Sequence, residues 1–219
     1  MNVILNAIEL RVLGSLIEKE LTTPEYHPLS LNALVNACNQ KSNRDPVLDL
    51  DETEVTKALD SLRFKQFALL SGMGGRVAKY RHALNEKFRF TPAELALLCE
   101  LLVRGPQTVG ELRTRAERMH QFNDIHEVEA VLEELVARTP AIAARLARQP
   151  GRKEPRYCQL FSGEPDLTVA EGATPQEAAR SKSGAENEKI AKLEEDLSEL
   201  RQEVSELRQM VADFKKSFE

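Results

Sequence analysis

The sequence lacks tryptophan, long apolar runs and a signal for secretion. Aromatic residues make up 5% of its 219 residues, a composition that favours small helical domains over a large sheet. No apolar run approaches the roughly 18 residues that a membrane-spanning helix needs. Glu9 and Arg11 interrupt the N-terminal segment where a signal peptide would have its apolar core. We therefore expect a cytoplasmic protein with no membrane partner.

Cysteine is scarce, and no catalytic motif is present. Cys38, Cys99 and Cys158 are too few and too far apart for a disulfide framework or a zinc site, so we expect buried, reduced thiols. The four histidines show no metal-binding spacing, and we expect His82 to be a hydrogen-bonded structural residue. The glycine-rich segment 71–76 lacks the Gly-Lys-Ser/Thr ending of a phosphate-binding loop. The sequence therefore predicts no metal, no cofactor and no enzyme activity.

The net charge of −5 is unevenly distributed along the chain. Residues 1–164 contain 22 Lys and Arg against 22 Asp and Glu, whereas residues 165–219 contain 8 against 13. The C-terminal part thus carries the whole excess of negative charge. The neutral remainder can still present local basic faces to a partner.

Residues 1–88 and 89–162 repeat one pattern. Each region begins with an amphipathic helix, continues with a shorter helix and then has a third helix. In the third helices, four apolar positions match at one constant offset: Val55, Ala58, Leu59 and Leu62 correspond to Val128, Val131, Leu132 and Leu135. This match indicates two copies of one structural unit.

The helix starts in both regions carry residues typical of N-terminal caps. A Ser, Thr or Asp side chain accepts a hydrogen bond from a free backbone N–H group, and a Glu three residues later completes a capping box. The predicted caps are Ser30, Asp51 with Glu54, Thr91 with Glu94, Thr108 with Glu111, and Asp124 with Glu127.

In each region the third helix is followed by two strand-like segments and a turn, at 67–84 and at 140–160. Three helices followed by a β-hairpin are typical of the winged helix, a helix-turn-helix unit with a β-wing. The predicted fold is mostly α with small β-hairpin wings (α+β). The predicted parts are winged-helix domains at 1–88 and 89–162, a flexible linker at 163–188 and a coiled coil at 189–219.

Three segments also resemble a known bacterial family. They are EKELTTPEYHPLSLNALVNACNQKSNRDPV (18–47), LLVRGPQTVGELRTRAERM (101–119) and RQPGRKEPRYCQLFSGE (148–164). Through them the chain resembles the YceH family over about residues 5–164, with a small departure in the loop at Tyr26-His27-Pro28. The resemblance implies tandem winged helices and, in many members, a C-terminal coiled coil. The family is functionally uncharacterised, so the resemblance implies no catalytic residue.

The C-terminal segment has a heptad repeat without a slip. Apolar residues alternate at spacings of three and four, which predicts a coiled coil, and β-branched residues at position a with Leu at d favour two parallel strands. The predicted dimerisation residues are Ile190, Leu193, Leu197, Leu200, Val204, Leu207, Val211 and Phe214.

The charges flanking this seam favour a parallel homodimer. Parallel strands would pair Lys189 with Glu194, Asp196 with Arg201 and Glu203 with Arg208, so each pair joins opposite charges. Two alternatives stay open. The segment would instead pack as an amphipathic helix on its own globular part, or it would form an oligomer larger than a dimer.

The charges of the third helices argue against major-groove reading in the second unit. Residues 124–138 contain five acidic residues and one basic residue, and phosphates would repel such a helix. Basic residues gather in the wings instead. Between residues 145 and 156, five Lys and Arg face only Glu154, which favours phosphate contact.

Two functional hypotheses follow. In the first, a transcription-associated homodimer binds duplex DNA through its wings and the loop at 39–44. In the second, the winged helices form a scaffold for another protein without direct DNA binding. The candidate nucleic-acid-binding residues are Gln40, Lys41, Asn43, Arg44, Arg76, Lys79, Arg81, Arg113, Arg115, Arg148, Arg152, Lys153 and Arg156.

Overall fold

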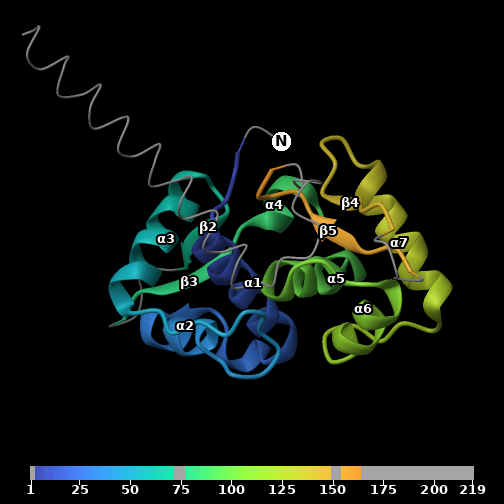
Figure 1. Ribbon diagram of the computed structural model, residues 1–219. Coiled ribbons are helices and arrows are strands. Elements are labelled where there is room, and N and C mark those ends of the chain that lie inside the picture. The colour runs from blue at the N-terminus through green and yellow to red at the C-terminus, as the bar shows by residue number, and fades with distance from the viewer. Residues whose placement is uncertain (1–2, 72–76, 149–153, 164–219) are drawn as a thin grey trace, which may run out of the picture. The chain divides into compact units, whose positions relative to one another are not determined.

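A computed structural model describes residues 3–71, 77–148 and 154–163. The first half of this region contains four α-helices, one short 3₁₀ helix and three short strands (Figure 1). In chain order they are α1 (Ala7–Thr22), the 3₁₀ helix η1 (Pro24–Tyr26), β1 (Leu29–Ser30), α2 (Leu31–Cys38), α3 (Glu52–Phe64), β2 (Ala68–Ser71), β3 (Lys79–His82) and α4 (Leu84–Phe88).

The second half repeats the order of three helices followed by two strands. Its elements are α5 (Pro92–Arg104), α6 (Val109–Ala116), α7 (Ile125–Ala137), β4 (Ala143–Arg145) and β5 (Tyr157–Gln159). The prediction of a mixed fold, mainly helical with small antiparallel sheets, is therefore confirmed. The predicted coiled coil at 189–219 and the predicted linker from residue 164 onward lie outside the described residues.

Each predicted cap residue is confirmed, but the box predicted for Asp124 with Glu127 is not, because the Glu127 carboxylate accepts from the backbone N–H of Asn123 instead. Asp51, Thr91 and Thr108 each accept a hydrogen bond from the backbone N–H of the Glu three residues later, and each Glu side chain bonds back to the cap backbone. Ser30 and Asp124 also accept a backbone hydrogen bond at the start of their helices. These local contacts fix where α2, α3, α5, α6 and α7 begin.

Both predicted hairpins form antiparallel sheets. β2 pairs with β3, with Leu70 opposite Tyr80, and β4 pairs with β5, with Ala144 opposite Cys158. Three elements were not predicted from the sequence, and one of them is the 3₁₀ helix η1. The two-residue strand β1 pairs with β3 and completes a sheet in the order β1-β3-β2, and α4 forms one and a half turns directly after β3.

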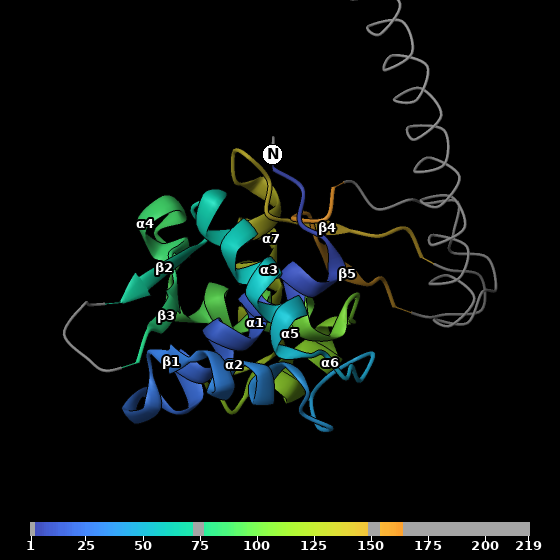
Figure 2. The same cartoon turned by 90° about the vertical axis from the view of Figure 1, so that its left-hand side faces the viewer.

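The two halves share one hydrophobic core, which extends from Leu5 to Phe161. α1 packs most extensively against α5, and the two helices lie side by side at the centre of the molecule in both views (Figures 1 and 2). The backbone N–H of Leu5 donates to the carbonyl of Phe161 at 2.7 Å, and the Phe161 ring packs edge-on against Phe67 at 5.7 Å between centroids. The predicted boundary near residue 88 therefore separates two similar sets of elements that share a core.

Gly14 permits the close contact between α1 and α5. A Cβ atom at this position would lie 2.6 Å from Cγ1 of Val103 and 3.1 Å from Cβ of Leu102. The thiol of Cys99 donates to the carbonyl of Gly14 at 3.3 Å. Among the helices that the structure describes, none is long and apolar enough to cross a membrane.

Gly14→Ala is expected to destabilise the protein. The added methyl group must displace α5, and overpacking of this kind typically lowers the free energy of unfolding by about 1–3 kcal/mol. Gly110→Ala in α6 is the matched control, because its Cβ would meet no atom within 4 Å, and a better helix former should leave stability unchanged or raise it by up to about 1 kcal/mol. Urea unfolding measures both effects. Equal stability of the two variants would contradict the close α1–α5 contact.

Candidate nucleic-acid interface

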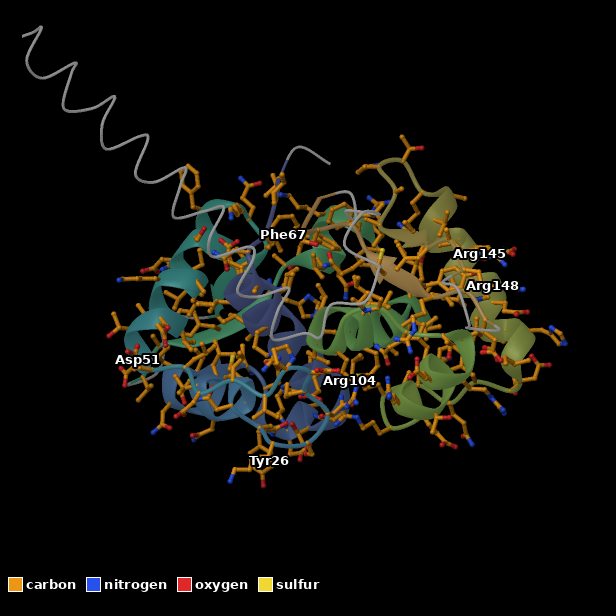
Figure 3. All side chains as sticks on the ribbon, viewed as in Figure 1. Tyr26, Asp51, Phe67, Arg104, Arg145 and Arg148 are labelled. Carbon is orange, nitrogen blue, oxygen red and sulfur yellow. The ribbon has the colours of Figure 1, made fainter. Side chains whose placement is uncertain are left out.

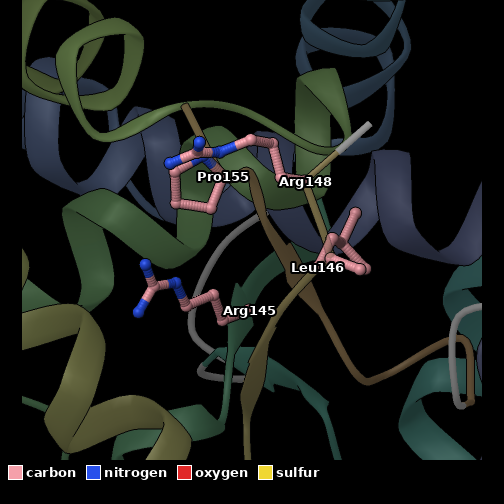
Figure 4. Close-up of a pocket in the computed structure, with 5 residues that line it drawn as sticks. Arg145, Leu146, Arg148 and Pro155 are labelled. Atoms are coloured by element: carbon pink, nitrogen blue, oxygen red, sulfur yellow. The ribbon is translucent and has the colours of Figure 1, made fainter. Parts of the chain in front are cut away.

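The second hairpin carries two exposed arginines, the predicted residue Arg148 and also Arg145, which was not in the predicted set. Arg145 and Arg148 are exposed and line a pocket of about 460 Å³ together with Leu146, Ala147 and Pro155. Figure 4 shows both guanidinium groups on one side of the strand and Leu146 on the other, and Figure 3 places both arginines on the second half of the protein. Neither forms an ion pair with a described carboxylate.

Two other predicted arginines, Arg115 and Arg156, attach the second hairpin to the rest of the protein. Arg156 donates to the carbonyl of Pro106 at 2.7 Å and pairs with Glu111 at 3.4 Å. Arg115 donates to Oε1 of Gln107 at 2.7 Å. Because Gln107 also exchanges two backbone hydrogen bonds with β5, these arginines connect the hairpin to α6. Their guanidinium groups are committed to the protein itself.

The first hairpin offers fewer free charges than predicted. Arg81 pairs with Glu86 at 2.5 Å, so its charge is already neutralised. Lys79 is exposed at the start of β3. On α6, Arg113 is exposed and contacts the carbonyl of Asn123 at 3.5 Å. Arg76, Arg152 and Lys153 lie outside the described residues.

The prediction for Arg44 needs correction. Its side chain is fully buried, and its guanidinium bonds to both oxygens of Glu18 at 2.5 and 3.0 Å and to the carbonyl of Ala37 at 2.8 Å. A buried cation needs such a partner because desolvation penalises an isolated charge. Arg44 is therefore unavailable to a phosphate.

The side chain of Asn43, next to Arg44, is also bonded within the protein. Its amide donates to Glu18 at 3.3 Å and to Glu100 of α5 at 2.9 Å, which commits both hydrogens of that amide. Only Gln40 and Lys41 of the predicted loop residues keep side chains available at the surface. The loop at 39–44 therefore serves mainly to connect the two halves.

Glu18 and Glu100 form a buried polar cluster between the halves. Arg118, which follows α6, pairs with Glu18 and lies 3.5 Å from Glu100. Burial acts to raise the pKa of Glu18, but the hydrogen bonds and charges of Arg44 and Arg118 outweigh it and lower the pKa to about 2. Burial raises the pKa of Glu100, whose Oε2 atom has no hydrogen-bond partner among the described residues.

His82 and the three cysteines are buried and are suited to a structural role. His82 is buried, its Nδ1 accepts from the backbone N–H of Leu84 at 3.3 Å, and its Nε2 lies 3.1 Å from Glu20, which confirms the structural role predicted for it. All three cysteines are buried, as expected, and burial raises the pKa of Cys38 to about 11. The described residues include no cluster of His, Cys, Asp and Glu suited to a metal ion.

Comparison with known proteins places the chain in a family. The family described as "Protein of unknown function, DUF480" matches residues 5–152. The chain belongs to the DUF480 family. A UPF0502 protein of Citrifermentans bemidjiense is 72% identical over the full length of both chains. Another, of Shewanella piezotolerans, is 50% identical over 85% of this chain and 89% of its own.

In this DUF480 member, the two buried carboxylates should respond oppositely to neutralisation. Glu18→Gln leaves Arg44 buried without a counterion, which should lower the free energy of unfolding near pH 7 by about 3–5 kcal/mol. Glu100→Gln should leave it unchanged or raise it, because the fold disfavours the charged form of Glu100. Urea unfolding of both variants tests this pair. A similar loss in both would contradict it.

Acid should abolish the contribution of Glu18. Its pKa in the folded protein lies below the ordinary value of 4.5, so its stabilisation is complete above about pH 4.5 and is lost as the pH falls toward 2. A shift of this size corresponds to about 3 kcal/mol. The difference in stability between the unmodified protein and Glu18→Gln should therefore shrink on acidification from pH ~7 to pH ~3. A constant difference would contradict the shift, because it would show that the pKa of Glu18 is the same in the folded and unfolded protein.

Proposed function

We propose that the protein is a non-enzymatic, DNA-binding homodimer in the cytoplasm, built from two tandem winged helices. The order of three helices followed by a two-stranded hairpin in both halves supports the winged-helix assignment, as does the resemblance to the YceH family. A transcription-associated role follows from this proposal, because winged helices commonly bind duplex DNA.

The exposed pair Arg145 and Arg148 is the observation that carries the proposal. Both line a pocket on the second hairpin and form no ion pair with a described carboxylate, although Arg145 also borders a groove lined by Glu129, Glu133 and Glu154. In the sequence the same hairpin continues with Arg152 and Lys153, so four cations lie within nine residues. Lys41, Lys79 and Arg113 supply further charges. Contacts of this kind bind phosphates and carry no base specificity.

A protein-binding scaffold is the second candidate function. It is favoured by α7, the helix that would have to approach the bases in the second winged helix. Glu129 and Glu133 lie one turn apart on α7 and line a groove between this helix and the second hairpin. There they would repel the phosphates of DNA. An acidic face of this kind suits a basic protein segment better than a nucleic acid.

Arg148→Ala is expected to weaken DNA binding uniformly across sequences. Loss of one phosphate contact should lower affinity several-fold and reduce the slope of log K against log salt by about 1. A gel shift on random duplex at a series of salt concentrations measures both. Arg89→Ala is the control, because Arg89 is an exposed arginine in the turn between α4 and α5. No retardation of the duplex at low salt would reject the DNA-binding function.

The heptad segment is expected to be responsible for dimerisation. A chain ending at Glu164 should be monomeric by light scattering, and the full chain should be a dimer. Leu200→Lys, which places a charge at a d position, should shift the full chain toward monomer, while Ser198→Lys outside the apolar seam should not. A truncated chain that remains dimeric would instead place the dimer contact in the helical body.

A further inference from the structure

A groove of about 320 Å³ lies between α7 and the second hairpin. Val109, at the start of α6, also lines it. Its lining combines apolar and charged side chains from these three elements: Val109, Ile125, Glu129, Glu133, Arg145, Glu154, Pro155 and Tyr157. The groove is distinct in composition from the neighbouring arginine pocket, with which it shares Arg145 and Pro155.

The charge of the groove is negative on balance. Three carboxylates, of Glu129, Glu133 and Glu154, face one guanidinium, that of Arg145. Glu133 and Glu154 form no ion pair with any residue in the described ranges, and Glu129 contacts only His126, at 3.4 Å. Carboxylates that lack cationic partners attract a cation from solution or from another molecule.

The groove also has an apolar side. Ile125 is 40% exposed, which is high for a large aliphatic residue, and Val109 is buried. The ring of Tyr157, a residue that is 4% exposed, lines the same side. The groove therefore places apolar surface next to its carboxylates.

We propose that the groove between α7 and the second hairpin binds an extended, arginine- or lysine-rich segment of a partner protein. The inference rests on the second candidate function and names the chemistry of its partner. A long basic side chain matches both parts of the groove, because its aliphatic stem packs on Ile125 and Tyr157 while its charged end lies between Glu129 and Glu133. Duplex DNA does not match, since its phosphates would meet three carboxylates.

Binding of a labelled peptide to the full chain tests the inference. The probe is fluorescein-labelled Arg-Leu-Arg-Ser-Arg-Leu, and the same peptide with Glu in place of Arg is its control. Fluorescence anisotropy should detect salt-sensitive binding of the basic peptide alone. Glu129→Gln with Glu133→Gln should raise its Kd at least about fivefold, since each ion pair contributes up to about 1 kcal/mol.

A second double variant separates the groove from general electrostatics. Glu117→Gln with Glu134→Gln removes the same charge from exposed positions that do not line the groove, and it should leave the Kd unchanged. Equal weakening by both double variants would overturn the inference. The inference would also be overturned if Glu129→Gln with Glu133→Gln bound the peptide as well as the unmodified protein does and retarded duplex DNA more strongly. That result would indicate that the groove is a nucleic-acid site.

Two further readouts distinguish the remaining outcomes. Light scattering of the groove variant should give the same mass as the unmodified chain, and a lower mass would identify the occupant as a second copy of this chain. The gel shift of Arg148→Ala is independent of the peptide assay. Peptide binding without DNA retardation would reject DNA binding and support the scaffold function. DNA retardation without peptide binding would reject the groove as a peptide site and support the DNA-binding function.

Discussion

The buried carboxylate of Glu18 connects the parts of this protein that would otherwise form two separate units. It lies on α1, accepts hydrogen bonds from Arg44 in the loop after α2, and pairs with Arg118 beyond α6. Asn43 extends the cluster to Glu100 on α5. Removing the Glu18 carboxylate leaves Arg44 as an uncompensated buried charge, at a cost of several kcal/mol. The relative position of the two halves, and hence of their hairpins, depends on this cluster and on the close packing at Gly14.

Several of the predicted basic residues turn out to stabilise the fold. Arg44 neutralises Glu18, Arg81 neutralises Glu86, and Arg156 fixes the second hairpin to α6. A guanidinium with several intramolecular acceptors gives them up only at a large cost in free energy. On the second hairpin, by contrast, Arg145 and Arg148 are exposed and form no ion pair with a described carboxylate, although Arg145 also lines the groove that contains Glu129, Glu133 and Glu154.

Local features of the fold could be predicted from the sequence, whereas burial of polar groups could not. Caps such as Thr91 with Glu94 depend on residues within one helical turn, so their prediction succeeded. β1 was missed because two residues become a strand only through pairing with β3, far along the chain. Arg44 was misplaced because a polar loop carries no local sign of burial. The available signal was on α1, where Arg11, Ser15 and Glu18 form a polar stripe within a buried segment.

The second half therefore presents two surfaces of opposite charge around a single hairpin. Arg145 and Arg148 point to a pocket without described carboxylates, while Glu129, Glu133 and Glu154 line the groove on the side of α7. Because Gln107, Arg115 and Arg156 hold the hairpin to α6, the two surfaces keep a fixed spacing. If the proposed partners bind, an anionic one is expected on the arginine side of the hairpin and a cationic one on the side of α7, because each side repels the opposite class of partner.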